Sequence, residues 1–208
     1  MHLSDSQSKV KELFEELLDR YGDSHKSLAY GSVETQMKKF EMLAGVGDLD
    51  GCTLLDVGCG FGDLHKFIEE MGLSVRYTGI DISPRLIDKA RKKYPEAEFM
   101  TGDIVSMDLE EESYDYVVGT GFNCFKTDHN WETISVAMDS MFQACREGVA
   151  LQMLSTYAPR HDESSYYASP EEILHLALGY TTRIVLRHDY APHDFTIYMY
   201  KNSPEGRK

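Results

Sequence analysis

The chain has few cysteines and no long apolar segment. Its 208 residues include four cysteines, and none of them belongs to a CxxC pair: Cys52, Cys59, Cys124 and Cys145. This spacing suits a reducing compartment and predicts no bound metal. No apolar run approaches the roughly 20 residues that a membrane-spanning helix needs, and the N-terminus lacks the basic-then-apolar order of a signal peptide. We therefore expect a cytoplasmic protein without a membrane partner.

Positive charge is also scarce. The sequence has 21 Lys and Arg residues against 35 Asp and Glu residues, which gives a formal net charge of −14. Nucleic-acid binding usually depends on a basic surface that displaces counterions from phosphates. The densest basic stretch, residues 85–94, is interpreted as the exposed face of a helix. We therefore expect no nucleic-acid partner.

The first quarter of the chain has helical periodicity. Apolar residues recur at intervals of three and four between Val10 and Leu18, and again between Val33 and Ala44. Each stripe predicts a helix with one buried face. We expect one domain, in which residues 1–47 form a helical cap on the compact cofactor-binding part, residues 48–208.

Strands and helices alternate after residue 52. Strand-like segments lie at 53–58, 75–81, 97–103, 114–120, 149–154, 181–189 and 195–201, and helical patterns lie at 63–71, 84–94, 131–146 and 170–178. Parallel neighbouring strands need a crossover of about a dozen residues, which these helices supply. Only the four residues 190–193 separate the segment that ends at residue 189 from DFTIYMYK (194–201), so the last two strands must form an antiparallel hairpin. The prediction is an α/β fold with a doubly wound, mostly parallel sheet of seven strands, helices on both faces and a terminal hairpin.

Three glycines follow the first strand at every second position. Gly58, Gly60 and Gly62 precede a helix that begins near Asp63, an arrangement that presents backbone N–H groups at the carboxyl end of a parallel sheet. Two acids end the next strands. Asp81 is placed to accept the two hydroxyls of a ribose, and Asp103 is placed to meet an adenine. Together these features predict a nucleoside cofactor.

The spacing of the glycines distinguishes between cofactors. A dinucleotide fingerprint reads GxGxxG, but here Asp63 occupies the position of the third glycine. A carboxylate there and another at Asp56 are unfavourable beside a pyrophosphate, which argues against a nicotinamide oxidoreductase. S-adenosylmethionine has no phosphate and carries a sulfonium and an ammonium group. It therefore fits both acids.

Three motifs carry a family resemblance. The segments LLDVGCGFGD (54–63), GIDIS (79–83) and GDI (102–104), followed by the closing hairpin, resemble the class I S-adenosylmethionine-dependent methyltransferases over roughly residues 50–200. The resemblance implies a Rossmann-like methyltransferase fold with S-adenosylmethionine as the cofactor. The resemblance also implies which residues contact the cofactor. The methionine part would lie along Asp56, Gly58, Cys59, Gly60 and Gly62, the ribose on Asp81, and the adenine against Ile82, Asp103 and Ile104. Gly119 is a further residue that we expect to contact the cofactor.

A lysine before the glycine turn is a further candidate. The segment ETQMKKFEML (34–43) is similar to the N-terminal cap of family members that act on small molecules. The resemblance implies that Lys39 meets the cofactor carboxylate. The alternative is that Lys38 and Lys39 lie on a solvated helix face.

Two loops at the carboxyl edge of the sheet are candidates for binding the methyl acceptor. Residues 119–131 lack the NPPY-type tetrad of enzymes that methylate amino groups of nucleic acids and glutamine, and Asn123 in this loop is predicted to contact the substrate. Residues 154–170 carry Tyr157, Tyr166 and Tyr167, which we predict to close over the acceptor. The alternative for this second loop is a solvated surface excursion.

Catalytic candidates are fewer. His188, His193 and Asp194 surround the final hairpin, and with Tyr157 they offer groups that can act as a general base, although they can equally terminate strands. The predicted reaction is a direct in-line transfer of the methyl group to a small molecule. The sulfonium already supplies the leaving group, so alignment of the acceptor with the methyl carbon can supply much of the catalysis. A protein or RNA acceptor and a non-catalytic cofactor-binding protein are the alternatives. The sequence leaves open the acceptor atom, the use of a base, and a monomer or homodimer.

Overall fold

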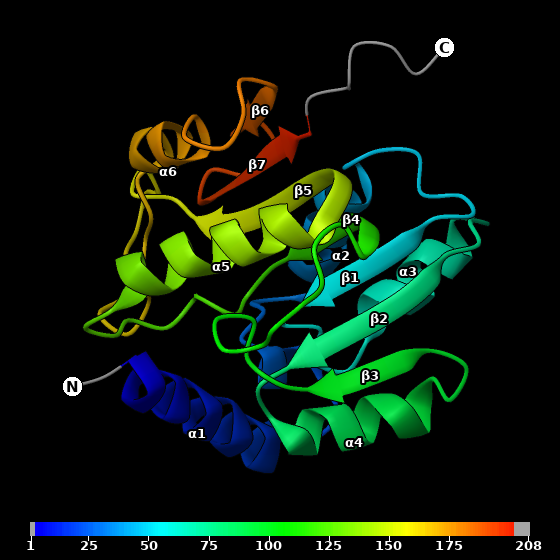
Figure 1. The fold of residues 1–208 in the computed structure, drawn as a ribbon. Coiled ribbons are helices and arrows are strands. Elements are labelled where there is room, and N and C mark those ends of the chain that lie inside the picture. The colour runs from blue at the N-terminus through cyan, green and yellow to red at the C-terminus, as the bar shows by residue number, and fades with distance from the viewer. Residues whose placement is uncertain (1–2, 202–208) are drawn as a thin grey trace.

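The computed structural model describes residues 3–201 and has an α/β fold built on one seven-stranded sheet (Figure 1). The strands lie in the order β3-β2-β1-β4-β5-β7-β6. Their bounds are β1 (Thr53–Val57), β2 (Arg76–Asp81), β3 (Glu98–Thr101), β4 (Tyr114–Gly119), β5 (Cys145–Leu154), β6 (Ile184–Arg187) and β7 (Asp194–Tyr200). The predicted fold class is confirmed.

The helices begin and end close to the predicted limits. They are α1 (Leu3–Tyr21), the short 3-10 helix η1 (His25–Leu28), α2 (Val33–Ala44), α3 (Asp63–Glu70), α4 (Pro84–Lys93), α5 (Asn130–Ala144) and α6 (Pro170–Ala177). The side chains of Ser32, Ser83 and Ser169 accept backbone N–H groups in the first turns of α2, α4 and α6, which fixes where these helices begin. The helix expected at 131–146 ends two residues early, since β5 begins at Cys145.

The final hairpin is antiparallel, as predicted, but its second strand lies inside the sheet. Strand β7 pairs antiparallel with both β5 and β6, whereas β1 to β5 pair in parallel. Helix α6 carries the chain from β5 past the position of β7 to the edge strand β6. The carboxyl ends of β1 to β5 therefore share one edge of the sheet, and Figure 1 shows α1 on the side toward which the arrowheads of β2 and β3 point.

Two apolar layers cover the sheet. Residues of α5 and α6 pack on one face around Ile134 and Ile173, and residues of α2, α3 and α4 pack on the other around Leu43, Ile68 and Ile87. Each layer buries a set of aliphatic side chains, the main source of stabilisation in such a fold.

The two helices of the predicted cap have different surroundings. Helix α2 belongs to one of the layers on the sheet, and the Tyr198 hydroxyl in β7 donates a hydrogen bond of 2.8 Å to the Met42 carbonyl. Helix α1 instead packs through Val10 and Phe14 on Phe61, at the carboxyl edge of the strands. Helix α1, with η1, lies over that edge as a cover, and α2 also reaches the edge through Lys39 and Phe40. Among residues 3–201, no helix combines the length and the hydropathy that a bilayer span requires.

Candidate functional site

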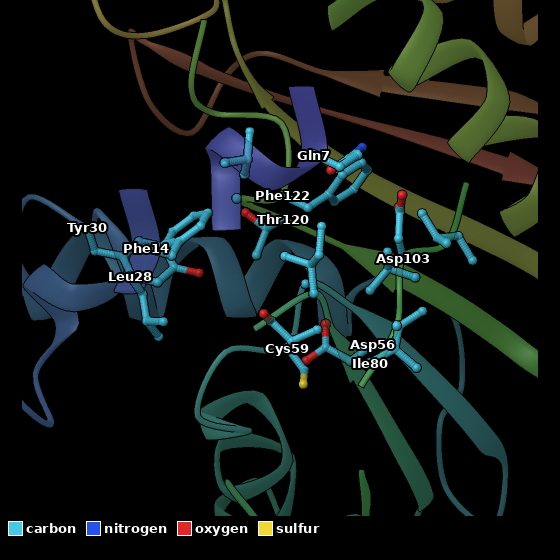
Figure 2. A pocket seen from close by; sticks show the side chains of 18 of the residues that line it. Gln7, Phe14, Leu28, Tyr30, Asp56, Cys59, Ile80, Asp103, Thr120 and Phe122 are labelled. Carbon is cyan, nitrogen blue, oxygen red and sulfur yellow. The ribbon is translucent and has the colours of Figure 1, made fainter. Parts of the chain in front are cut away.

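A cavity opens at the carboxyl ends of β1, β2 and β4, beneath α1 (Figure 2). It contains about 750 Å³ of space, part of it open to solvent. Four segments that follow strands supply one wall, and the first 40 residues supply the other. The lining residues are Asp56, Val57, Gly58, Cys59, Ile80, Asp81, Ile82, Gly102, Asp103, Ile104, Thr120, Gly121 and Phe122, with Gln7, Val10, Phe14, Leu28, Tyr30 and Phe40 opposite them.

The glycine turn fits tightly against the protein around it. Gly58, Gly60 and Gly62 have φ angles of 75°, 56° and 77°, in the left-handed region that glycine tolerates. A Cβ atom at Gly60 would lie 2.7 Å from Leu28, and one at Gly62 would lie 2.7 Å from Phe99. Of the three glycines, Gly58 lines the cavity. The turn therefore needs glycine both for its backbone and for its packing.

Asp81 is held by two backbone donors. Its carboxylate accepts hydrogen bonds from the N–H of Gly60 (3.0 Å) and from the N–H of Ser83 (2.9 Å). The side chain is buried, and burial raises its pKa to about 6, although the two N–H donors act in the opposite direction. Each carboxylate oxygen has further acceptor capacity, so Asp81 can also accept the two hydroxyls of a ribose.

Asp56 is a second buried carboxylate in the wall. The Tyr77 hydroxyl donates a hydrogen bond of 2.5 Å to its Oδ2. Burial raises the pKa of Asp56 to about 7, the Tyr77 hydrogen bond lowers it, and the nearby Asp81 raises it further. Within the described residues, no cation is paired with either carboxylate. Both groups therefore favour a ligand that brings positive charge.

The predicted adenine contacts come together on the same wall. Ile82, Asp103 and Ile104 line the cavity, and Asp103 accepts a hydrogen bond of 3.1 Å from the N–H of Val105. Partial burial raises the pKa of Asp103. The two isoleucines provide an apolar surface beside a carboxylate acceptor, which suits a flat heterocycle with polar edges.

Cys59 and Gly119 have packing roles in this wall. Cys59 lines the cavity, and burial raises the pKa of its thiol well above the usual range. Gly119 is not among the lining residues: a Cβ atom there would lie 3.0 Å from the Phe122 ring, which fills the space. Neither residue offers a charged group to a ligand.

A second, smaller cavity adjoins the first. Gly121 and Phe122 line both. The smaller cavity is also lined by Lys39, Asn123, Cys124, Ile134, Leu151, Gln152, Met153 and Leu154. Its walls are mostly apolar, with a few polar groups, as is usual where proteins bind small organic molecules.

The structure places Lys39 on a buried carboxylate. Its Nζ lies 3.2 Å from Oδ1 of Asp194, which is 1% exposed. Gln152 donates a hydrogen bond of 2.8 Å to the same oxygen and accepts one from the Thr120 hydroxyl. Because Thr120 lines the first cavity and Lys39 the second, this network joins the two.

The predicted acceptor residues separate into two groups. Asn123 lines the second cavity, and its Nδ2 has no hydrogen-bond partner among the described residues, whereas its Oδ1 accepts from Asn130. Tyr157, Tyr166 and Tyr167 are not among the residues that line either cavity. They lie in a loop that is fastened to the segment after β4.

The contacts of these tyrosines account for their positions. Tyr157 is 63% exposed and donates a hydrogen bond to Glu171. The ring of Tyr167 stacks on His161 with centroids 4.0 Å apart. The backbone N–H of Tyr166 donates a hydrogen bond of 2.9 Å to the Cys124 carbonyl. Because Cys124 lines the second cavity, this end of the loop lies beside that cavity.

The two histidines of the hairpin do not line either cavity in the described part of the chain. His188 is packed against the rings of Tyr157 and Phe195, and its Nε2 is buried without a partner among residues 3–201. His193 is partly exposed, with Nε2 3.4 Å from Asp194. Of the three predicted hairpin residues, Asp194 alone belongs to the network between the cavities.

Several lining residues were not predicted individually. Tyr30 and Thr120 face the first cavity, and burial raises the pKa of Tyr30 above its usual range. Gln7 and Phe14 reach it from α1, as Figure 2 shows. The apolar stripe of α1 was a visible signal for Phe14, but nothing in the sequence marked Tyr30 or Gln7.

Comparison with known proteins agrees with this geometry. Residues 54–148 match a methyltransferase domain family. The protein Rv1506c of Mycobacterium tuberculosis, whose name places it among methyltransferases, is 31% identical over 165 residues, which cover 76% of this chain and 98% of that protein. The demethylmenaquinone methyltransferase of Chlorobaculum tepidum is 26% identical over 90% of this chain and 76% of its own length.

Solved structures share the fold. A Listeria monocytogenes structure titled as an S-adenosylmethionine-dependent methyltransferase superimposes with a TM-score of 0.63 at 15% identity, covering 81% of this chain and 99% of that chain. The phosphoethanolamine N-methyltransferase 2 of Haemonchus contortus, solved with S-adenosyl-L-methionine, gives a TM-score of 0.64 at 17% identity, covering 84% and 45%. At these identities the likeness shows the fold alone.

The first cavity fits the cofactor of this family. Two buried carboxylates in its wall can accept a cation and the hydroxyls of a ribose, and its isoleucines offer an apolar surface to a flat heterocycle. The motifs, the match to Rv1506c over 76% of this chain and the cavity agree. The chain belongs to the class I S-adenosylmethionine-dependent methyltransferases.

Proposed function

We propose that this enzyme methylates a small molecule that occupies the second cavity, by direct transfer of the methyl group. The observation that carries the proposal is that the two cavities adjoin: Gly121 and Phe122 line both, so ligands in the two would lie next to each other. Such adjacency supplies the alignment that a displacement reaction requires. When bound, S-adenosylmethionine supplies a methyl group already activated by its sulfonium.

The size and chemistry of the second cavity support a small acceptor. Ile134, Leu151 and Met153 form an apolar surface, and the Asn123 amide nitrogen is a donor without a partner among the described residues. An acceptor oxygen that binds this amide would remove the cost of an unsatisfied buried donor. We therefore expect a mostly apolar molecule with an oxygen near the reacting atom.

The same walls favour an acceptor that is already nucleophilic. Lys39 and Cys124 are the titratable residues that line this cavity in the described part of the chain. Burial raises the pKa of Cys124 to about 12, and Lys39 is paired with Asp194. The Cys124 thiol is therefore not a ready base near neutral pH, and Lys39 is held by its carboxylate partner. The residues therefore align the acceptor and exclude water, and we propose that His188, His193 and Tyr157 take no proton from it.

The named relatives are consistent with an acceptor of this kind. The demethylmenaquinone methyltransferases, by their name, act on demethylmenaquinone, a quinone and not a macromolecule. The net charge of −14 opposes a polyanionic acceptor.

A labelling experiment tests the proposal. The enzyme is incubated with methyl-labelled S-adenosylmethionine and a cell extract of the source organism. The products are then separated into small-molecule, protein and nucleic-acid fractions. Label is expected in small molecules, at a lower rate with Asn123→Ala and at an unchanged rate with Gln143→Ala, a change on the exposed face of α5. Label in macromolecules alone would overturn the small-molecule acceptor. Transfer unaffected by Asn123→Ala would overturn its placement in the second cavity.

A further inference from the structure

A buried histidine lies on the side of the molecule away from both cavities. His65, in the first turns of α3, is 5% exposed and packs against the ring of Tyr77 with centroids 5.1 Å apart. Its Nδ1 is buried and makes no hydrogen bond within the part of the chain that the structure describes. A buried nitrogen without a partner is costly, and it marks a place where a ligand is expected.

Two carboxylates converge on this nitrogen. Glu69 Oε2 lies 3.7 Å from it and Glu96 Oε1 lies 3.9 Å from it, both too far for a hydrogen bond. Glu69 is four residues further along α3, on the same helix face. Glu96 comes from the turn between α4 and β3. The three ligand atoms lie within 4.8 Å of one another, and both glutamate side chains are about half exposed and free to adjust.

We propose that His65, Glu69 and Glu96 bind one divalent transition-metal ion, with zinc as the best fit. Imidazole nitrogen and carboxylate oxygen are its common ligands, and two ligands of a tetrahedral zinc lie about 3.4 Å apart. The two distances from Nδ1 of His65 are a few tenths of an ångström longer, and a small rotation of the exposed glutamate side chains would bring all three atoms, now within 4.8 Å of one another, to that spacing. An ion would satisfy the buried nitrogen and neutralise two carboxylates in a chain with a net charge of −14.

The site is accessible and leaves room for further ligands. An open cleft beside it is lined by His65, Glu69 and residues 72–75. Water molecules in this cleft would complete the coordination, since the protein supplies three ligands. The cysteine spacing predicted no bound metal, and that spacing carries no information about a site built from a helix and a distant turn.

The position of the site indicates a stabilising function. The ion would tie α3 to the turn that precedes β3, whereas the cofactor cavity lies where the strands end. Figure 1 shows α3 and the connection from α4 to β3 toward one end of the sheet and α1 at the other. The ion is therefore expected to raise the melting temperature and to leave cofactor affinity unchanged.

Zinc titration in competition with a chromogenic chelator tests the proposal. We expect one equivalent to bind to the metal-free protein. Glu96→Gln and Glu69→Gln, which change exposed side chains, should each weaken binding at least about tenfold, as loss of a ligand does. Glu70→Gln is the matched control, because Glu70 is the exposed neighbour of Glu69 and pairs with Lys66. It should bind zinc as the original chain does.

Two outcomes would overturn the site. The first is the absence of one-equivalent binding, or binding that both glutamate variants retain. The second is a thiolate charge-transfer band in the spectrum of the cobalt-substituted protein, since a cysteine would then be a ligand in place of carboxylate and imidazole. Unchanged affinity for S-adenosylhomocysteine in the zinc-free protein supports the stabilising function, and its loss would contradict it.

Discussion

The affinity for the cofactor should depend on pH through Asp56. Burial raises the pKa of this carboxyl to about 7, so in the free protein about nine-tenths of it is ionised at pH 8 and about one-tenth at pH 6. A bound ammonium group favours the ionised form. If the ligand binds that form alone, its affinity should fall about tenfold between pH 8 and pH 6. Asp81, with a pKa of about 6, would add about a further factor of two if it also binds ionised.

Calorimetry with S-adenosylhomocysteine measures this effect. The product keeps the ammonium group and the ribose, and titrations in buffers of different ionisation enthalpy count the protons released on binding. We expect nearly one proton at pH 6 and almost none at pH 8.5. In Asp56→Asn, the affinity at pH 8 should be lower and the dependence on pH largely lost. Constant affinity from pH 6 to 8 without proton release, or a full pH dependence in the variant, would refute the reasoning.

The same raised pKa sets the stability of the free protein. The folded pKa of Asp56 lies above the unfolded value, so its contribution is fully present below about pH 4 and is lost as the pH rises through about 7. The shift corresponds to an upper limit of about 4 kcal/mol. Urea unfolding should therefore show Asp56→Asn gaining stability relative to the original chain at pH 8 and losing that advantage at low pH.

Other side chains allow three more tests. Asp81→Ala should weaken S-adenosylhomocysteine binding by about 1.5–3 kcal/mol in calorimetry, because charge-assisted hydrogen bonds are lost; affinity equal to that of the original chain would contradict the ribose site. Lys39→Met leaves its buried carboxylate partner without a cation and should lower the free energy of unfolding by about 3–5 kcal/mol, whereas Lys38→Met removes an exposed pair and should cost less than about 1 kcal/mol. Phe14→Ala opens the cover of the cavity and should weaken cofactor binding, whereas Leu13→Ala on the exposed side of α1 should not; equal effects of the two would show that α1 acts only through folding.

The sequence predicted the framework because its signals are local. Each strand is a short apolar run, each helix has its own stripe, and a parallel sheet places the ends of successive strands at one edge. Asp56, Asp81 and Asp103 are therefore predictable as neighbours although they are far apart in the chain. The strand order β5-β7-β6 was not predictable, because a four-residue connection makes the two strands antiparallel but does not determine which of them lies inside the sheet.

Partners across the fold were not predictable. The stripes of α1 and α2 look alike in the sequence, yet one covers a cavity and the other packs on the sheet. A stripe requires a buried face without specifying its partner. The resemblance implied that Lys39 is a cation near the cofactor. Its contact with Asp194 was not predictable, because the two residues are 155 positions apart in the chain. The partner Glu96 of His65 is distant in the same way.

A crystal structure of the complex with S-adenosylhomocysteine tests the central claim most directly. The account predicts the ligand in the cavity beneath α1, with its ribose hydroxyls within hydrogen-bond distance of the Asp81 carboxylate and its amino-acid part beside Asp56. It also predicts that the sulfur faces Gly121 and Phe122, toward the second cavity. A ligand whose ribose lies away from Asp81, or whose sulfur is separated from the second cavity by protein, would contradict it.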